Sequence, residues 1–285
     1  MIILNFSGGL GNQLFQYAFG RALSLKYNVP LLIDKTFYKK NAGSKFILNK
    51  FNIKSEGYFK SFLSEKFKRF YTFAKIINIF SSTKVYYEKF FHFDANIGKL
   101  NLKNKNYHFY GYWQSFKYFK NILAELNNDF NFHSYIKNRK LLLNKIENIQ
   151  NISIHVRGGD YKSEPHYSLH GLLSAEYYNS AVNYLKKKKT INKIFLFTND
   201  VKYARKLAKN FNFKYELISN LETNSSFEDF AFLRLSHNKI ISNSTFAWWA
   251  AMLSKKKSIV ICPINWFKDK KIKINDLFPN NWKKI

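Results

Sequence analysis

The chain has 285 residues, which allows one large domain or two domains of roughly 100 to 200 residues each. Hydrophobic residues make up 46% of it, so a full core can form, and only 11 glycines and 4 prolines argue against a disordered or collagen-like protein. The single cysteine, Cys262, excludes an intramolecular disulfide and any metal site built from several cysteines.

The charge balance is strongly basic, with 47 lysines and arginines against 18 aspartates and glutamates and a formal net charge of +29. Such a charge attracts nucleic acid, anionic lipid or phosphorylated substrates. Most of the excess is lysine, and it accompanies asparagine, phenylalanine, isoleucine and tyrosine, which an AT-rich coding sequence also favours. The charge therefore selects a class of partner without naming one.

No signal peptide or membrane span is predicted. Residues 1–6 form a short apolar run without a basic leader, and no other apolar stretch approaches the roughly 18 residues that a span requires. We expect a cytoplasmic protein whose basic surface makes loose, peripheral contact with the anionic inner face of a membrane.

The first half opens as a strand, a glycine turn and a helix with one apolar face. Residues 36–105 show no clean periodicity, so no element is predicted there. The predicted elements of this half are, in chain order, a strand at 2–6, a turn at 7–12, a helix at 13–26, strands at 31–33 and 107–112, and a helix at 117–126.

In the second half, short apolar runs alternate with helical patterns, which is typical of βαβ units on a parallel sheet. The predicted strands are 152–156, 194–197, 215–218, 239–242 and 259–262, and the predicted helices are 175–188, 202–210, 227–235 and 245–253. With a joint near residues 135–150, we predict an N-terminal α/β domain at 1–145 and a C-terminal one at 146–285.

The first candidate segment, Ser7–Gln13, follows a strand and opens a helix. Gly9 and Gly11 let the backbone approach a ligand, and N–H groups at a helix start can hold an anion. With Asp34 closing the second strand, the pattern imitates a dinucleotide-binding turn, but Leu14 stands where the third glycine belongs. A tight turn without a ligand is the alternative.

The second candidate segment, Ile154–Tyr161, lies at the carboxyl end of a strand, where open α/β sheets bind ligands. Arg157 can donate two parallel hydrogen bonds to a phosphate, and Asp160 can orient it or take a proton. The alternative is an Arg157–Asp160 pair that braces a turn, with His155 satisfied in the core.

Two further segments, Phe197–Asp200 and Ser242–Trp249, also follow strands. Ser244 is placed to cap a helix that begins at Thr245, and such a helix start is a second phosphate site. Capping alone would equally explain Ser244. Asp200 can accept a hydrogen bond from a base or ribose, or merely cap the next helix.

Together these strand-end turns predict two Rossmann-like domains that face across a cleft holding a nucleotide. The eight aspartates form no Asp-x-Asp and the seven histidines no His-Glu-x-x-His, so no metal site is predicted. Arg157, lysines and helix dipoles would then neutralise a diphosphate.

The chain resembles the bacterial α-1,2-fucosyltransferases, glycosyltransferase family 11, in three segments, Gly8–Ala18, His155–Tyr161 and Ser242–Trp249. Their order and spacing are similar over nearly the whole chain. The resemblance implies a GT-B fold and an inverting transfer of L-fucose from GDP-β-L-fucose to the 2-hydroxyl of a terminal galactose, without a metal or other cofactor. The acceptor would be an O-antigen, lipopolysaccharide or H-antigen-like oligosaccharide, or a lipid-linked glycan.

The resemblance also implies site residues. His155 and Asp200 match positions that contact guanine, and Arg157 matches the arginine that holds the diphosphate. Arg157 and Asp160 are the predicted catalytic residues, and Glu164 or a residue of the first turn is an alternative base. Asn12 and Gln13 are placed toward the acceptor. The predicted donor contacts are Gly9, Gly11, Asn12, His155, Arg157, Asp200, Ser244, Thr245 and Phe246.

One position departs from the family, whose central motif normally reads His-x-Arg-Arg-x-Asp, because Gly158 replaces the second arginine. This change predicts weaker or reoriented donor binding, a different GDP-sugar or acceptor, or low activity. Two other classes are weighed: an oxidoreductase would need the missing third glycine, and a nucleic-acid-binding protein would need arginine-rich or aromatic-glycine motifs. Neither feature is seen, so we expect no nucleic-acid partner.

Overall fold

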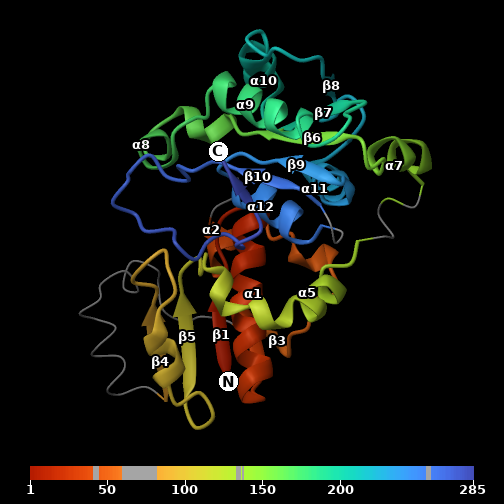
Figure 1. Ribbon diagram of the computed structural model, residues 1–285. Coiled ribbons are helices and arrows are strands. Elements are labelled where there is room, and N and C mark those ends of the chain that lie inside the picture. The colour runs from red at the N-terminus through yellow and green to blue at the C-terminus, as the bar shows by residue number, and fades with distance from the viewer. Residues whose placement is uncertain (41–44, 60–81, 133–135, 137, 255–257) are drawn as a thin grey trace. The chain divides into compact units, whose positions relative to one another are not determined.

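The computed structural model describes residues 1–285 except 41–44, 60–81, 133–135, 137 and 255–257 (Figure 1). The chain divides into two compact units, Met1–Asn131 with Lys273–Pro279 (unit 1) and Phe132–Ile272 with Asn280–Ile285 (unit 2). The boundary between the two units, after Asn131, comes earlier in the chain than the predicted boundary at residue 145. The return of 273–279 to unit 1 rests partly on Asp276, whose backbone oxygen accepts from Phe116 N at 2.9 Å and whose carboxylate accepts from Phe93 N at 2.9 Å.

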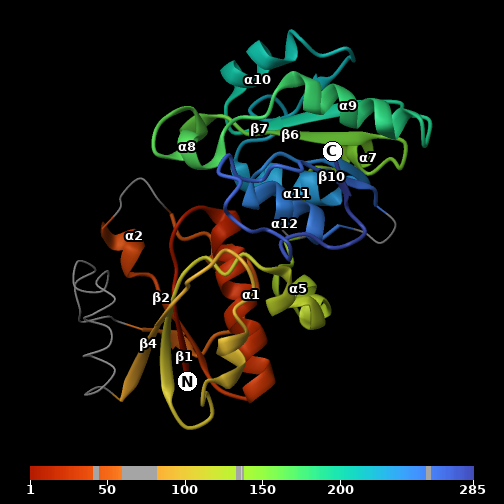
Figure 2. The same ribbon diagram turned by 60° about the vertical axis from the view of Figure 1, so that its left-hand side comes forward.

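Unit 1 is built on a five-stranded sheet in which every pair of neighbours is parallel. The strand order is β3 (Gly57–Tyr58), β2 (Leu31–Asp34), β1 (Ile2–Asn5), β5 (Asn106–Tyr110) and β4 (Thr83–Tyr87). Helix α1 (Leu10–Tyr27) packs on this sheet (Figures 1 and 2). The ring of Phe19 in this helix lies 5.3 Å from that of Phe109 and is stacked on Trp113 at 4.2 Å. The other helices in the described part of unit 1 are α2 (Thr36–Lys40), α5 (Leu123–Asp129) and 3₁₀ segments at Leu48–Lys50, Ala95–Lys99, Phe116–Tyr118 and Lys120–Ile122.

Unit 2 is built on a six-stranded sheet, again with parallel neighbours throughout. The order is β11 (Lys283–Lys284), β10 (Val260–Cys262), β9 (Asn238–Ile240), β6 (Ile152–Val156), β7 (Ile194–Thr198) and β8 (Glu216–Leu217). From β6 the chain adds β7 and β8 on one side and then β9, β10 and β11 on the other, which is the Rossmann order. The helices are α7 (Lys140–Ile146), α8 (His166–His170), α9 (Ala175–Lys186), α10 (Val201–Ala208), α11 (Ser226–Leu235) and α12 (Thr245–Met252).

The predicted fold class, an α/β protein with two Rossmann-like units, is confirmed by the two parallel sheets. The predicted helix at 117–126 is wrong, because two 3₁₀ segments precede a short α5 that begins at Leu123. The first of these segments starts where the Ser115 side chain accepts from Lys117 N, and the rings of Phe116 and Phe119 meet at 5.9 Å. In the stretch where no element was predicted, β3 and β4 form the two edges of the unit 1 sheet. No described helix is long and apolar enough to cross a membrane.

Helix α1 approaches the sheet most closely at Gly20. A Cβ atom there would lie 2.2 Å from Leu4 Cδ1 and 2.9 Å from Leu31 Cδ1, and both leucines are buried. We expect Gly20→Ala to lower the free energy of unfolding by about 1–2 kcal/mol, because overpacking outweighs the roughly 1 kcal/mol gain in helix propensity. Urea unfolding measures this. The control Gly98→Ala meets no atom within 4 Å, and an unchanged stability of Gly20→Ala would contradict the packing.

Candidate functional site

In unit 2 the predicted donor residues gather at one edge of the sheet. Arg157 follows β6, Ser244 follows β9, and Asp200 follows β7. Strands β6 and β9 are neighbours, and the strand order reverses between them. Open parallel sheets bind ligands at the carboxyl ends of their strands at such a reversal. The structure thus brings together three segments that are far apart in the sequence.

Arg157 is held from two directions. Its Nη2 atom donates to Asp160 Oδ1 at 2.5 Å, and its guanidinium carbon lies 4.8 Å from the centre of the Tyr161 ring. Both contacts fix the guanidinium and leave its other N–H groups for a ligand, since the buried Nε has no protein partner. The Arg157–Asp160 pair is therefore observed, and it fits both sequence alternatives, an arginine oriented for a ligand and a pair that braces the turn.

His155 is buried beside this arginine. Its Nδ1 lies 2.7 Å from Ser242 Oγ, and its ring centre lies 5.5 Å from that of Phe246. Burial, helped by the charge of Arg157, lowers the pKa of His155 to about 3. The imidazole is therefore neutral at physiological pH, and only Nε2 is left for a further hydrogen bond.

Asp200 braces the turn after β6. Its Oδ1 accepts from Tyr203 N at 3.0 Å and so caps α10, as one sequence alternative held. Its Oδ2 accepts from Gly159 N at 3.1 Å and pairs with Lys162 at 2.5 Å. Burial raises the pKa of Asp200, but these bonds outweigh it and hold that pKa below its usual value.

The start of α12 lies after β9. Ser244 occupies the N-cap position as predicted, but its side chain makes no capping hydrogen bond. Thr245 and Phe246 follow in the first turn and are partly exposed. The first N–H groups of a helix have no acceptor within the helix, so this turn can face an anion.

Two residues that the sequence analysis did not assign, His170 and Asn243, support Arg157 indirectly through Tyr161. The His170 ring stacks on Tyr161 at 4.4 Å and 6°, and burial lowers the pKa of His170 to about 4. Asn243 Nδ2 donates to the carbonyl of His170 at 2.8 Å and thereby ties α8 to the loop after β9. Asn243 and His170 are 73 positions apart, so no local pattern could reveal the contact between them.

In unit 1 the glycine turn and the loop after β5 share the carboxyl edge of the sheet, because β1 and β5 are neighbours. Helix α1 begins at Leu10, not at Gln13, so Gly11, Asn12 and Gln13 lie in its first turn. Gly8 has a φ of 76°, and a Cβ there would meet Asn12 Nδ2 at 2.6 Å. The glycine is therefore required both by its backbone conformation and by the approach of Asn12.

Gln13 and Gln16 hold this edge together. Gln13 Nε2 donates to the carbonyls of Gly8 at 3.0 Å and Lys45 at 2.8 Å, and its Oε1 accepts from Ile47 N. Gln16, which was not predicted, donates to the carbonyl of Gly111 at 2.9 Å. Gln13 thus braces the turn, and its contact with an acceptor stays a prediction.

The amide of Asn12 lies at the same edge and is partly exposed. Its Oδ1 accepts from Gln114 Nε2 at 3.2 Å. The loop that carries Gln114 is fastened by Glu88, which accepts from the backbone N–H groups of Tyr112 at 2.6 Å and Trp113 at 2.8 Å. Burial raises the pKa of Glu88 to about 7 against the effect of these bonds.

Asp34 does not play the part that a dinucleotide-binding turn would give it. Its carboxylate is fully buried, with Oδ2 3.1 Å from His108 Nε2 and Oδ1 accepting from Thr36 N at 2.9 Å. A ribose cannot reach it there, which argues against the oxidoreductase alternative. Among the described residues, no group of three or more histidine, cysteine, aspartate or glutamate side chains could hold a metal ion.

Gly158, which stands in place of the family's second arginine, is enclosed by α10. Its N–H donates to Asn199 Oδ1 at 2.9 Å, and a Cβ atom would lie 2.7 Å from Tyr203 Cδ1 and 3.0 Å from Asp200 Cβ. The space next to this backbone is therefore filled by Tyr203.

We expect that restoring the arginine will not by itself improve the site. Gly158→Arg should cost about 1–3 kcal/mol of stability through overpacking against Tyr203, and Gly158→Arg with Tyr203→Ala should recover part of that loss. Thermal unfolding with and without GDP measures both effects, and Tyr203→Ala alone is the control. A single variant as stable as the parent would disprove the enclosure of Gly158.

Comparison with known proteins identifies the group to which this chain is similar. A model of glycosyl transferase family 11 matches residues 1–285. An Escherichia coli protein named alpha-1,2-colitosyltransferase is 29% identical over 100% of this chain and 99% of its own length. The O-antigen biosynthesis glycosyltransferase WbnK of Escherichia coli is 30% identical over 92% of this chain and 93% of its own length.

Solved structures are similar in fold at low sequence identity. A variant of FUT1 from Arabidopsis thaliana in complex with GDP has a TM-score of 0.54 and 13% identity, over 95% of this chain and 72% of that chain. NodZ alpha-1,6-fucosyltransferase co-crystallised with GDP has a TM-score of 0.51 and 13% identity, over 89% of this chain and 92% of that chain. These similarities support the fold alone.

Proposed function

Because the chain belongs to glycosyltransferase family 11, we propose that it transfers a GDP-linked 6-deoxyhexose to a hydroxyl group of a surface oligosaccharide. The observation that carries the proposal is Arg157, which lies where the strand order reverses and is preoriented by Asp160 and Tyr161. A guanidinium held in this way suits the diphosphate of a nucleotide sugar. The presence of GDP in the structures of NodZ and FUT1, which are similar in fold, supports the choice of base.

L-Fucose is the first candidate sugar, as the three signature segments imply. Colitose, which is L-fucose without its 3-hydroxyl, is the second, and the name of one Escherichia coli relative favours it. Gly158 bears on this choice, because the arginine of the family motif is absent beside the donor residues and Tyr203 fills part of its space. We propose O-antigen or a similar glycan with a terminal galactose as the acceptor, in line with the name of the second relative.

The proposed reaction is a single inverting displacement without a metal ion. The acceptor 2-hydroxyl attacks the anomeric carbon and gives its proton to a base. GDP leaves with its charge stabilised by Arg157 and the start of α12. Asp160 is already paired with Arg157, so we assign it the orientation of that arginine ahead of the role of base. Glu164, whose carboxylate accepts from Ser168 N at 3.2 Å, remains the alternative base.

We expect the enzyme to work in the cytoplasm, in peripheral contact with an anionic membrane on which surface glycans are assembled. The net charge of +29 supports such contact. No nucleic-acid partner is proposed.

The function is tested by measuring GDP release from GDP-L-fucose and GDP-colitose with galactose-terminated acceptors, with and without EDTA. We expect release that resists EDTA and yields a glycosylated product with one of the two donors. The ratio of kcat/KM between the donors identifies the sugar. A melting shift with GDP but no turnover with either donor would reject the proposed sugars, and the absence of a GDP shift would reject the nucleotide site.

Arg157→Ala should reduce kcat/KM by on the order of 10²–10³, which corresponds to about 2–4 kcal/mol of lost stabilisation of the leaving diphosphate. Arg157→Lys should recover only part of it, because an ammonium cannot donate two parallel hydrogen bonds. Steady-state kinetics measure both variants. Arg205→Ala, which removes an exposed arginine of α10, is the control. Unchanged kcat/KM in Arg157→Ala would contradict the assignment.

A further inference from the structure

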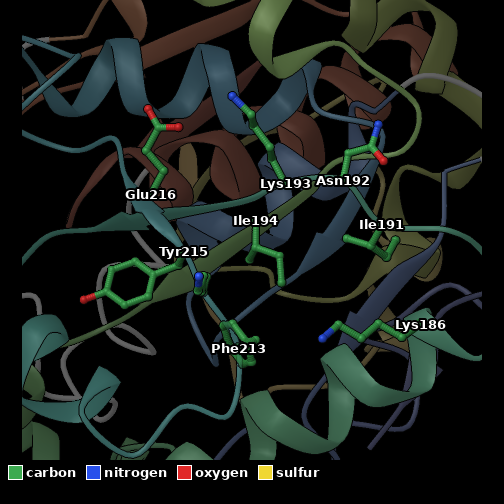
Figure 3. Close-up of a pocket in the computed structure, with 9 residues that line it drawn as sticks. Lys186, Ile191, Asn192, Lys193, Ile194, Phe213, Tyr215 and Glu216 are labelled. Carbon is green, nitrogen blue, oxygen red and sulfur yellow. The ribbon is translucent and has the colours of Figure 1, made fainter.

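A pocket of about 410 Å³ lies at the edge of the unit 2 sheet opposite the donor residues (Figure 3). It is formed where β7 and β8 begin and where α9 ends. Its lining includes Lys186, Ile191, Lys193, Phe213, Lys214 and Tyr215. Strand β6 spans five residues, or about 16 Å, between the two edges, so an occupant of this pocket would leave the donor edge uncovered.

The pocket is basic. Lys186, Lys193 and Lys214 are exposed, and no carboxylate pairs with any of them among the residues that the structure describes. The acidic residue of the lining, Glu216, is already paired with Lys145. The three ammonium groups are therefore available to an anion.

The charge extends beyond the pocket. Residues 177–215 contain nine lysines and one arginine but a single carboxylate, Asp200, which lies at the opposite edge where it caps α10. Lys186, Lys187 and Lys188 are exposed at the end of α9, whereas Lys189 donates to Asn238 Oδ1 at 3.1 Å. Favourable interaction with the helix dipole explains one or two cations at this point but not a run followed by further lysines.

The edge is also ordered and partly apolar. Asn192 N donates to the carbonyl of Gln150 at 3.0 Å, and Lys193 N donates to Asn151 Oδ1 at 3.2 Å, so the loops before β6 and β7 are joined. Ile149, in the loop before β6, is 60% exposed. An aliphatic side chain among lysines on a fixed surface is suited to a layer that is anionic outside and apolar beneath.

We propose that this edge, defined by Lys186–Lys188, Lys193, Lys214 and Ile149, docks unit 2 on an anionic membrane, with a lipid phosphate in the pocket. The inference deepens the membrane contact in the proposed function by assigning it to a surface. Nucleic acid fits less well, because Phe213 and Tyr215 pack against the core of unit 2 and are only partly exposed, which limits the ring surface on which a base can stack.

The test is sedimentation of the full chain with vesicles of phosphatidylcholine alone or mixed with phosphatidylglycerol, at physiological salt. We expect binding to the mixed vesicles only. The triple variant Lys186→Glu, Lys193→Glu, Lys214→Glu should lower the partition coefficient at least about tenfold, because several lysines near the surface each contribute to binding. The matched control Lys99→Glu, Lys103→Glu, Lys105→Glu makes the same charge change at exposed positions of unit 1 and should stay within about threefold of the parent.

The possible outcomes separate cleanly. Equal loss in both triple variants would show that net charge alone drives binding, and no binding by the parent would reject the membrane; either result overturns the proposal. Loss of single-stranded oligonucleotide binding in the first variant, with vesicle binding unchanged, would overturn it in favour of nucleic acid. An unchanged GDP melting shift and unchanged GDP release on a soluble acceptor show that the variant is folded. Specific loss of vesicle binding in a chain that transfers no sugar would leave this inference standing while rejecting the proposed function.

Discussion

Parallel strand pairing is the constraint on which the candidate site depends. Because the neighbouring strands of both sheets run in the same direction, every loop that follows a strand comes out at one edge of its sheet. In unit 2 this brings Arg157, Asp200 and Ser244 to the same edge, although the first and last are 87 positions apart. In unit 1 it places the glycine turn beside the loop that carries Gln114. The same constraint places the starts of β7 and β8, with their lysines, at the opposite edge of unit 2.

Buried polar side chains hold these loops in place. Gln13, Gln16, Asp200 and Asn243 each bind backbone groups of loops that have no regular structure of their own. Removing such a side chain leaves buried backbone groups without a partner, which costs about 1–3 kcal/mol each. A loss of activity on replacing Gln13 or Asp200 is therefore expected whether or not the side chain touches a substrate, and the place of Gln13 in the first signature segment is explained by support of the loops.

The region around Gly158 shows how a family motif can vary without loss of the fold. The glycine removes one cation next to Arg157, and Tyr203 occupies the adjoining space while Asn199 accepts a hydrogen bond from the N–H group of Gly158. The two residues are thus coupled by packing, and a change at one requires a change at the other. Exposed lysines gather instead at the amino-terminal edge of the unit 2 sheet, where Lys186–Lys188, Lys193 and Lys214 lie around the end of α9 and the starts of β7 and β8. The proposed donor site and the exposed lysines therefore lie at opposite edges of the unit 2 sheet.

The sequence by itself determined the fold class, most strands of the second half and the segments that form the site. Alternation of apolar runs with helical periods is a local property, and glycines and caps mark where strands give way to helices. The sequence analysis did not predict β3 and β4, because edge strands pair on one side only and are short or partly exposed. The segment Phe116–Ile122 likewise depends on a serine cap and ring packing that mimic a helical pattern.

Only the tertiary structure decided what the marked side chains do. Asp34 is buried inside unit 1 against His108, 74 positions away, and Asp160 is paired with Arg157 while Asp200 holds the turn after β6. His170, which lies outside the three signature segments, and Asn243, which lies within the third, support the arginine through Tyr161. Hydrogen bonds and ring contacts of this kind depend on which strands become neighbours. That information is distributed over the whole chain and is not contained in any one segment.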